Sequence, residues 1–360
     1  MTSSAEQPHY AVLYQAAPVP PLGGCYKPQK PNGYRDSSAD IAWTLQQRGH
    51  RVVTPVTKPD PAVDGDWSFP DTAEGIAAAC AAGANTLWAN TVLYAAHPIT
   101  QAIAEGVWII GQEPAMAEKY DDKWVTHELL RQAGLPVPAM LRVGHTAETA
   151  ESSALAELTV ATIEELLGSF PVIVKPVRGR GSQGVSRVDS LAELQSAVAA
   201  LISARSEFAG ERYPSYGEYV LVEEYLPGAE CTVGVWCGAR YALHCSTPVV
   251  RRQHVIGVLP YSGDVPVRQN SSLMEAHEFD IPPIQRMCLD ATRLLLPRAI
   301  IRIDCRQDHQ GQWRMFDVNL KPNLTGSGRP GRGDQDSLLA IAVGKYADLV
   351  ERLARARWRV

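Results

Sequence analysis

Residues 221–233, LVEEYLPGAECTV, decide how the rest of the chain is interpreted. An apolar run typical of a buried strand ends in Glu223 and Glu224, and a Pro-Gly turn separates these acids from Glu230. Such acids are usually solvated strand ends. A strand end can also bind a purine nucleotide, because its backbone presents N–H and C=O groups to a base edge while carboxylates accept hydrogen bonds from an amine or from ribose. We therefore expect Glu223 at the adenine amine, the backbone of Glu224 and Leu226 at the ring edge, and Glu230 at the ribose hydroxyls.

The composition is that of an ordinary globular protein. The 360 residues predict two or three lobes, and 45% apolar with 20% charged residues predicts a sizeable core. A net charge of -5 gives no basic field for nucleic acid or an anionic membrane, so neither is an expected partner. The seven scattered cysteines form no CxxC pair, and no window reaches the roughly 18 apolar residues of a membrane helix. These features predict a cytoplasmic protein with reduced thiols.

The first 120 residues alternate between strand and helix patterns, which predicts an open parallel α/β sheet. A long Pro- and Gly-rich connection, Gln15–Asp36, follows the first strand, and long loops in compact domains are often functional. The expected strands are Tyr10–Tyr14, Arg51–Thr54 and Thr86–Ala89, and the expected helices are Ser37–Arg48 and Asp71–Ala82.

Two α+β lobes are expected after this domain, over 121–227 and 228–360, with the first domain at 1–120. The Gly144–Ser169 stretch is predicted to be an exposed insertion, and Ala209–Glu218 a flexible surface loop. One expected helix begins at Asp121, and three others cover Ser190–Arg205, Pro283–Leu296 and Lys345–Arg357. The expected strands are Pro171–Lys175, Tyr219–Leu226, Cys231–Cys237, Arg240–Cys245, Ala299–Cys305 and Trp313–Asn319.

Gly179–Gly184 reads GRGSQG and matches GxGxxG. A dinucleotide-binding fold would need a helix after this loop, but Val185–Val188 looks like a returning strand, so a hairpin is favoured. A kinase is excluded because Lys175 precedes the loop. The glycines let backbone N–H groups approach phosphates, Ser182 adds a hydroxyl donor, and Lys175 adds a charge. An ordinary hairpin turn and a lysine extending from a strand end remain the alternatives.

Two further strands carry polar residues at alternate positions. Alternation places Arg302 and Asp304 on one face, and likewise Asp317 and Asn319. Three oxygen ligands on neighbouring strands suit magnesium, which bridges substrate phosphates. Arg302 beside them could neutralise a transferring phosphoryl group or a developing oxyanion. Taken singly, these residues could also be surface charges.

Together these elements resemble the ATP-grasp superfamily, and in detail its D-alanine–D-alanine ligase branch of carboxylate–amine ligases. The resemblance runs from about Asp122 to Ser337. It rests on Asp122-Lys123, VIVKPVRGRGSQGVSRV, LVEEYLPGAECTV, IRIDCR and MFDVNLKPNLTGSG, in that order.

The resemblance implies an ATP-grasp fold in which two lobes hold ATP between them. It implies that Lys123 and Lys175 hold the ATP phosphates under the Ser182 loop. Ile173 and Phe316 would sandwich the adenine, with core packing as the competing explanation. It further implies that Asp304, Asp317 and Asn319 bind two magnesium ions, or manganese in their place. Arg302 and Ser182 would stabilise the reacting centre.

The sequence also departs from the family. Asp317 stands where a glutamate is usual, and Asn323 and Gly328 replace a glycine and an acceptor-contacting serine. The long Gln15–Asp36 loop replaces the usual donor-binding sequence, so synthesis of the cell-wall dipeptide is not expected. Arg329 and Arg332, with Asn323, could contact a substrate carboxylate, or the arginines could be exposed loop residues. Lys27, Lys30 and Arg35 carry the same two interpretations.

The sequence hypothesis is an ATP-dependent ligase that joins amino acids or small derivatives through an acyl phosphate, releasing ADP and phosphate. Two alternatives stay open: a carboxylase or another acyl-phosphate enzyme on the same fold, and a nucleotide-binding protein without turnover. The expected partners are small amino acid or peptide substrates. A homodimer, common in the family, stays open as well.

Overall fold

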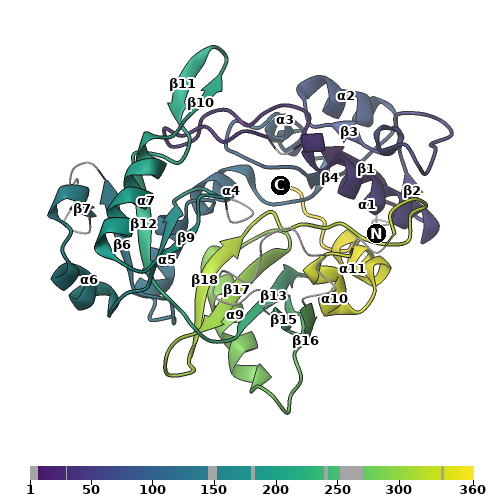
Figure 1. Cartoon of the computed structure of the whole chain (residues 1–360). Coiled ribbons are helices and arrows are strands. Elements are labelled where there is room, and N and C mark those ends of the chain that lie inside the picture. The colour runs from purple at the N-terminus through teal and green to yellow at the C-terminus, as the bar shows by residue number, and fades with distance from the viewer. Residues whose placement is uncertain are drawn as a thin grey trace.

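The computed structural model describes residues 7–29, 31–144, 152–179, 183–238, 242–251, 271–333 and 336–360. Three groups of elements surround a common centre: an N-terminal α/β unit, a central lobe and a C-terminal lobe (Figure 1). Two predicted site residues, Lys30 and Ser182, lie outside the described residues. The predicted boundaries at 120 and 227 stay predictions.

The N-terminal sheet is parallel throughout, as predicted. Its order is β2-β1-β4-β5, with β3 paired to the end of β1. The apolar runs of the two central strands are buried because helices cover the sheet. The elements are β1 (His9–Tyr14), η1 (Pro31–Tyr34), α1 (Arg35–Gln47), β2 (Arg51–Val52), η2 (Asp64–Asp66), β3 (Phe69–Pro70), α2 (Ala73–Ala81), β4 (Thr86–Asn90), α3 (Ile99–Ala104) and β5 (Trp108–Ile110).

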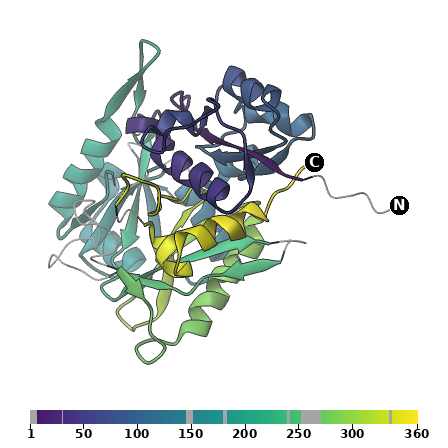
Figure 2. The same cartoon turned by 90° about the vertical axis from the view of Figure 1, so that its right-hand side faces the viewer.

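The C-terminal helices return to the N-terminal unit. Helix α11 (Tyr346–Ala354) packs on α1, and α10 (Leu338–Val343), which the sequence did not predict, precedes it (Figure 2). Trp358 forms a β-bridge with Ile109, so the chain end extends the N-terminal sheet. The N-terminal unit is therefore completed by residues about 250 positions away.

The central lobe is a five-stranded sheet in the order β7-β6-β12-β8-β9. The glycine loop joins antiparallel β8 and β9, which confirms the hairpin and not a strand-to-helix turn. The elements are α4 (Pro114–Tyr120), α5 (Lys123–Gln132), β6 (Met140–Gly144), β7 (Ser152–Ala154), η3 (Leu155–Glu157), α6 (Val160–Leu167), β8 (Val172–Pro176), β9 (Ser186–Val188), α7 (Leu191–Ser203), β10 (Arg205–Phe208), β11 (Glu211–Pro214) and β12 (Tyr219–Glu224).

Two sequence predictions for this lobe are wrong. The described part of Gly144–Ser169 is no exposed insertion, because β7 pairs with β6 and α6 buries Ile163 and Leu167 in the lobe's core. The Ala209–Glu218 stretch is no featureless loop either, because β11 pairs with β10 in a two-stranded hairpin. In both cases polar and small residues hid a regular element.

The C-terminal lobe is an antiparallel sheet in the order β16-β15-β13-β17-β18, with β14 beside β13. Cys231, Val233 and Ile303 pack on α9, so their face is the core and the alternate residues face the central lobe. Among the described residues no helix is long and apolar enough to span a membrane. The elements are β13 (Glu230–Cys237), β14 (Leu243–Cys245), β15 (Val249–Arg251), β16 (Ser271–Leu273), α9 (Ile281–Leu295), β17 (Ile301–Gln307) and β18 (Trp313–Asn319).

Candidate active site

The acids of the opening stretch are not solvated. In the antiparallel register, Glu223 lies opposite Ile173 and Leu221 lies opposite Lys175, so these four side chains share one face of the sheet. The alternate valines of both strands form the core beneath α6 and α7. Glu223 is only 3% exposed, which a solvent-facing strand end would not be.

The buried acid Glu223 pairs with a buried lysine. The ammonium of Lys175 donates to the Glu223 carboxylate and, at 3.0 Å, to the carbonyl oxygen of Phe316 in β18. Burial raises the pKa of Glu223, and the charge of Lys175 opposes that rise. Because the lysine bonds both strands, it joins the central lobe to the C-terminal lobe at the face predicted to bind ATP.

Glu224 is tied to a neighbouring strand segment. Its N–H donates to the carbonyl of Ala139 at 2.9 Å, and its carboxylate accepts from the Ala139 N–H at 3.1 Å. A purine edge at Glu224 would therefore have to use its carbonyl oxygen and not its N–H. Leu226, the other residue predicted at the ring edge, is buried.

The polar face of the C-terminal sheet brings the predicted metal and reacting residues together. Asp304 lies opposite Asp317, and Arg302 lies opposite Asn319. Asp304 accepts from the Thr232 hydroxyl at 2.7 Å and from the Arg302 guanidinium at 2.7 Å. The amide nitrogen of Asn319 donates to Asp317 at 2.9 Å. The four predicted residues thus form two hydrogen-bonded pairs that lie opposite each other on neighbouring strands.

Lys123 reaches this group from α5. Asp122 caps that helix by accepting from the N–H of Val125 at 3.1 Å, and this sets the position of Lys123 in the first turn. The Lys123 ammonium lies 2.5 Å from a carboxylate oxygen of Asp317. Burial acts to raise the pKa of Asp317, but the hydrogen bond and charge of Lys123, together with the charges of Lys175 and Arg302, hold that pKa below its usual value.

The donor set fits a hard divalent cation. Two carboxylates on one face with an adjacent amide oxygen suit magnesium, which uses few protein ligands and keeps several waters. The ammonium of Lys123 already stands at Asp317 as a positive charge, so the place accepts a cation. Within the described ranges no group of three or more His, Cys, Asp or Glu residues could hold a metal ion, so a protein-only cage is not present.

Glu230 lies between two arginines that the sequence analysis missed. Arg251 and Arg306 are both its direct cross-strand partners, at 3.7 and 3.8 Å from its carboxylate oxygens. Burial raises the pKa of Glu230 to about 7, and the two arginines act against that rise. Arg306 could have been found, since it continues the alternation of Arg302 and Asp304. Arg251 could not, because its placement depends on sheet register.

Phe316 occupies a β-bulge. Asp304 pairs with Asp317 and Cys305 pairs with Met315, so Phe316 is the extra residue between them. A bulge changes the direction of a side chain within a strand and often lies beside a functional site. Ile173 is 6% exposed on the facing strand β8. Whether these two side chains enclose a base stays a prediction.

The two arginines predicted at the substrate contact acids of the N-terminal unit. Arg329 is buried and bonds Asp40 at 2.8 Å, Asp64 at 2.5 Å and the Pro61 carbonyl at 2.7 Å. Arg332 also contacts Asp40, at 3.1 Å. The two arginines therefore fasten the loop after β18 to the N-terminal unit, and they are not exposed loop residues either.

The other predicted substrate residues also have local partners. Asn323 donates to the Thr325 hydroxyl at 3.0 Å within its own loop. Arg35 donates to the Tyr14 hydroxyl at 2.7 Å. Lys27 lines a cavity described below.

Comparison with known proteins agrees with this geometry. Residues 129–329 match the family model described as the D-Ala–D-Ala ligase C-terminus. The chain belongs to the D-alanine–D-alanine ligase family. A D-alanine–D-alanine ligase from Marinomonas sp. is 30% identical over 255 residues, covering 69% of this chain and 68% of the relative. This confirms the predicted resemblance, which was expected over nearly the same residues.

Other members of the D-alanine–D-alanine ligase family align over less of their length. The relative from Alcanivorax borkumensis is 30% identical over 209 residues, which are 57% of this chain and 55% of that protein. The chain thus spans little more than half the length of such relatives. A D-alanine–D-alanine ligase from Bacillus anthracis, complexed with ATP, aligns with a TM-score of 0.58 at 14% identity, covering 96% of this chain and 99% of the other. That likeness confirms the ATP-grasp fold.

Proposed function

We propose that this family member is an ATP-dependent carboxylate–amine ligase that forms an amide bond between amino acids or small amino acid derivatives. The observation that carries the proposal is the junction of the two lobes at Lys123, Lys175, Asp317 and Glu223. Residues from β8, β12, α5 and β18 meet there on one face, although they are up to 194 positions apart in sequence. A group of opposite charges between two lobes can hold a charged nucleotide and exclude water from it.

The proposed reaction has two steps. A carboxylate oxygen of the first substrate attacks the γ-phosphorus of ATP, the bond from that phosphorus to the ADP oxygen breaks, and an acyl phosphate forms. The amine of the second substrate then attacks the acyl carbon, the bond to the phosphate oxygen breaks, and phosphate leaves as the amine loses a proton. ADP, phosphate and an amide are the products.

The residues of this chain position the groups and offset charge. Lys123 and Lys175 would hold the phosphates, with Ser182 as a donor above them. Arg302 would stabilise the negative charge that develops at the phosphoryl group and then at the acyl oxygen, a contribution commonly worth several kcal/mol. Glu223 and Glu230 would bind adenosine.

Asp304, Asp317 and Asn319 would hold magnesium, or manganese in its place. The metal would supply positive charge that lowers the cost of bringing two anions together. Lys123 would have to leave Asp317 to reach the phosphates.

The substrate pair is proposed to differ from two D-alanines. Gly328 stands where an acceptor-contacting serine is expected for that chemistry, Asn323 stands where a glycine is expected, and the loop over 15–36 replaces the donor-binding sequence. These differences support a role in specialised metabolism, not in cell-wall synthesis.

The test is ADP release by the full chain with magnesium, ATP and amino acids alone and in pairs, with products read by mass spectrometry. We expect release that needs two amino acids and a product mass equal to their sum minus one water. Turnover that needs only bicarbonate would indicate a carboxylase. ATP binding with no turnover on any substrate would indicate a nucleotide-binding protein.

A further inference from the structure

A cavity of about 520 Å³ lies beside the nucleotide face. Its walls come from the loop after β1, the hairpin of the glycine loop and the β10–β11 hairpin. Gln183 and Gly184 of its lining belong to the glycine loop expected over the phosphates, and the other described residues that line it have no role assigned in ATP binding above. Pockets for small molecules have volumes of roughly 300–1,000 Å³. The cavity therefore has room for a second ligand while ATP is bound.

The loop that forms one wall is held in place at several points. Tyr26 donates its N–H to the Pro214 carbonyl at 3.0 Å and packs its ring 4.9 Å from that of Phe208. The N–H of Gln15 donates to the Gly33 carbonyl at 2.9 Å. A wall fixed by such contacts costs little ordering entropy when a ligand binds.

Most of the wall is apolar. Val19, Leu22, Val92, Leu93 and Tyr216 supply hydrocarbon surface. The charged residues on the wall carry both signs, Arg178 and Lys27 against Glu118 and Asp121. This wall favours an apolar group over a second charged group.

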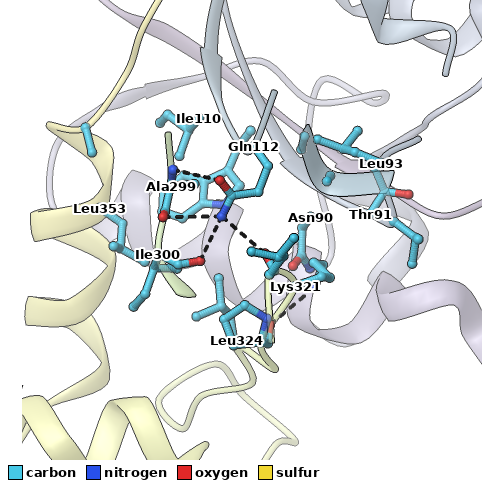
Figure 3. Close-up of a pocket in the computed structure, with 18 of the residues that line it drawn as sticks. Asn90, Thr91, Leu93, Ile110, Gln112, Ala299, Ile300, Lys321, Leu324 and Leu353 are labelled. Atoms are coloured by element: carbon cyan, nitrogen blue, oxygen red, sulfur yellow. Dashed lines mark hydrogen bonds between the residues drawn. The ribbon is translucent and has the colours of Figure 1, made fainter. Parts of the chain in front are cut away.

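A smaller recess, shown in Figure 3, lies next to this cavity. Val92, Leu93 and Asp121 line both spaces, so the two are neighbours. Ile300 and Lys321 line the recess, and each lies two positions from Arg302 or Asn319, about 7 Å along an extended chain. The recess thus shares residues with the cavity and lies at the strand ends next to Arg302 and Asn319.

Asn90 presents an unused acceptor in this recess. Its amide nitrogen donates to the hydroxyls of Ser37 and Ser38, each at 2.9 Å. These hydroxyls donate in turn to the carbonyls of Tyr34 and Leu13, so they must accept from Asn90, which fixes the amide orientation. The Oδ1 atom of Asn90 is buried and receives no hydrogen bond from any residue that the structure describes. Such an acceptor calls for a donor on a ligand.

Lys321 places a positive charge in the same recess. Its ammonium lies 4.0 Å from the centre of the Tyr34 ring, and the Tyr34 carbonyl lies 3.4 Å from the Asn90 amide nitrogen. Asn90 and Lys321 both line the recess, as Figure 3 shows. An acceptor beside a cation matches the ammonium and carboxylate of an α-amino acid.

We propose that these connected spaces bind the carboxylate substrate, and that it is an α-amino acid with a large apolar side chain. The substrate ammonium donates to Asn90 Oδ1, its carboxylate lies between Lys321 and Arg302, and its side chain extends past Val92 and Leu93 into the cavity. This inference rests on the proposed function and names its substrate class. A methyl side chain would leave most of the apolar wall in contact with water.

The test compares kcat/KM for ADP release with alanine, valine, leucine and phenylalanine, each as both enantiomers and with a fixed amine partner. We expect leucine or phenylalanine to exceed alanine by at least about tenfold, since each buried methylene is worth roughly that much in a fitted pocket. Alanine used as well as or better than the larger amino acids would overturn the inference and leave the proposed function standing. No ADP release with any amino acid would contradict both the inference and the proposed function.

A variant that narrows the cavity gives an independent measurement. Leu22→Trp adds bulk to the loop wall, and Leu166→Trp adds the same bulk to an exposed position of α6, where the leucine is 47% exposed. We expect Leu22→Trp to lower kcat/KM for the large amino acid at least tenfold and for alanine less than twofold, and Leu166→Trp to change neither. Equal loss for large and small amino acids with Leu22→Trp would contradict the placement of the side chain.

Discussion

At the scale of single residues, Glu230 is a buried acid whose charge changes near neutral pH. Burial between two strands raises its pKa to about 7, while Arg251 and Arg306 oppose that rise. An ionised carboxylate accepts hydrogen bonds from ribose at both oxygens, whereas protonation turns one oxygen into a donor and removes the charge that strengthens the other bond. ATP binding by this residue should therefore be strong above pH 7 and weaken as the pH falls through 7.

The corresponding prediction is that the dissociation constant for ATP rises about tenfold from pH 8 to pH 6, because the ionised fraction falls about tenfold over that range. Isothermal titration calorimetry measures it. Glu230→Gln should bind ATP more weakly at pH 8 than the parent and should lack the part of the pH dependence that comes from Glu230. Because ATP itself titrates in both proteins, the variant also serves as the control for that titration. The same pH dependence in both proteins would show that Glu230 does not contact the nucleotide.

Arg302 allows a prediction about chemistry separate from binding. Arg302→Lys keeps a positive charge but loses the planar group that bonds Asp304 at 2.7 Å. We expect kcat to fall by roughly 10²–10³ with the dissociation constant for ATP nearly unchanged, as when a transition-state donor is removed. The matched control is Arg314→Lys, because Arg314 forms a similar pair with Asp308 farther along the same sheet. This variant should keep the parent kcat. A loss confined to ATP binding would make Arg302 a nucleotide ligand only.

At the scale of elements, alternation was a reliable guide where one face of a strand is buried. It predicted the polar faces of β17 and β18, and the apolar run before Glu223 marked β12 correctly. It failed for β10 and β11, whose residues are exposed or half-buried on both faces, so that no apolar face signals a strand. It also failed for β7, which is three residues long.

Helix α6 is the element on which sequence and structure differ most, and it can be tested directly. Ile163 is fully buried under the central sheet, whereas Leu166 is 47% exposed. Ile163→Ala should lower the free energy of unfolding by about 2–5 kcal/mol, and Leu166→Ala by no more than about 0.5 kcal/mol. Urea unfolding followed by circular dichroism measures both. Equal small effects would restore the exposed insertion that the sequence alone predicted.

At the scale of the whole molecule, the three units are joined by charges that no local pattern reveals. Arg329 and Asp40 are 289 positions apart and form a buried pair between the loop after β18 and α1. A glycine-rich loop with two arginines is also what a substrate site would show, so sequence alone could not choose. The strands that carry the predicted nucleotide residues were easier to predict, because their motifs are local and occur in a fixed order.

The interdomain role of Arg329 predicts a loss of stability. Arg329→Met keeps the bulk of the side chain but leaves Asp40 buried without its main partner, which costs roughly 3–5 kcal/mol. Arg293→Met, which breaks an exposed pair with Asp290 on α9, should cost about 0.5 kcal/mol or less. Both are measured as free energies of unfolding in urea. If Arg329→Met were as stable as the parent but raised KM for an amino acid tenfold, the arginine would belong to the substrate site after all.

The central claim is that the two lobes hold a magnesium nucleotide between β8–β12 and β17–β18. A crystal structure of the full chain with magnesium and a non-hydrolysable ATP analogue tests it most directly. The account predicts the adenine between Ile173 and Phe316, the ribose at Glu230, and Lys123 moved from Asp317 to the phosphates. A nucleotide bound elsewhere, or none bound at saturating concentration, would contradict it.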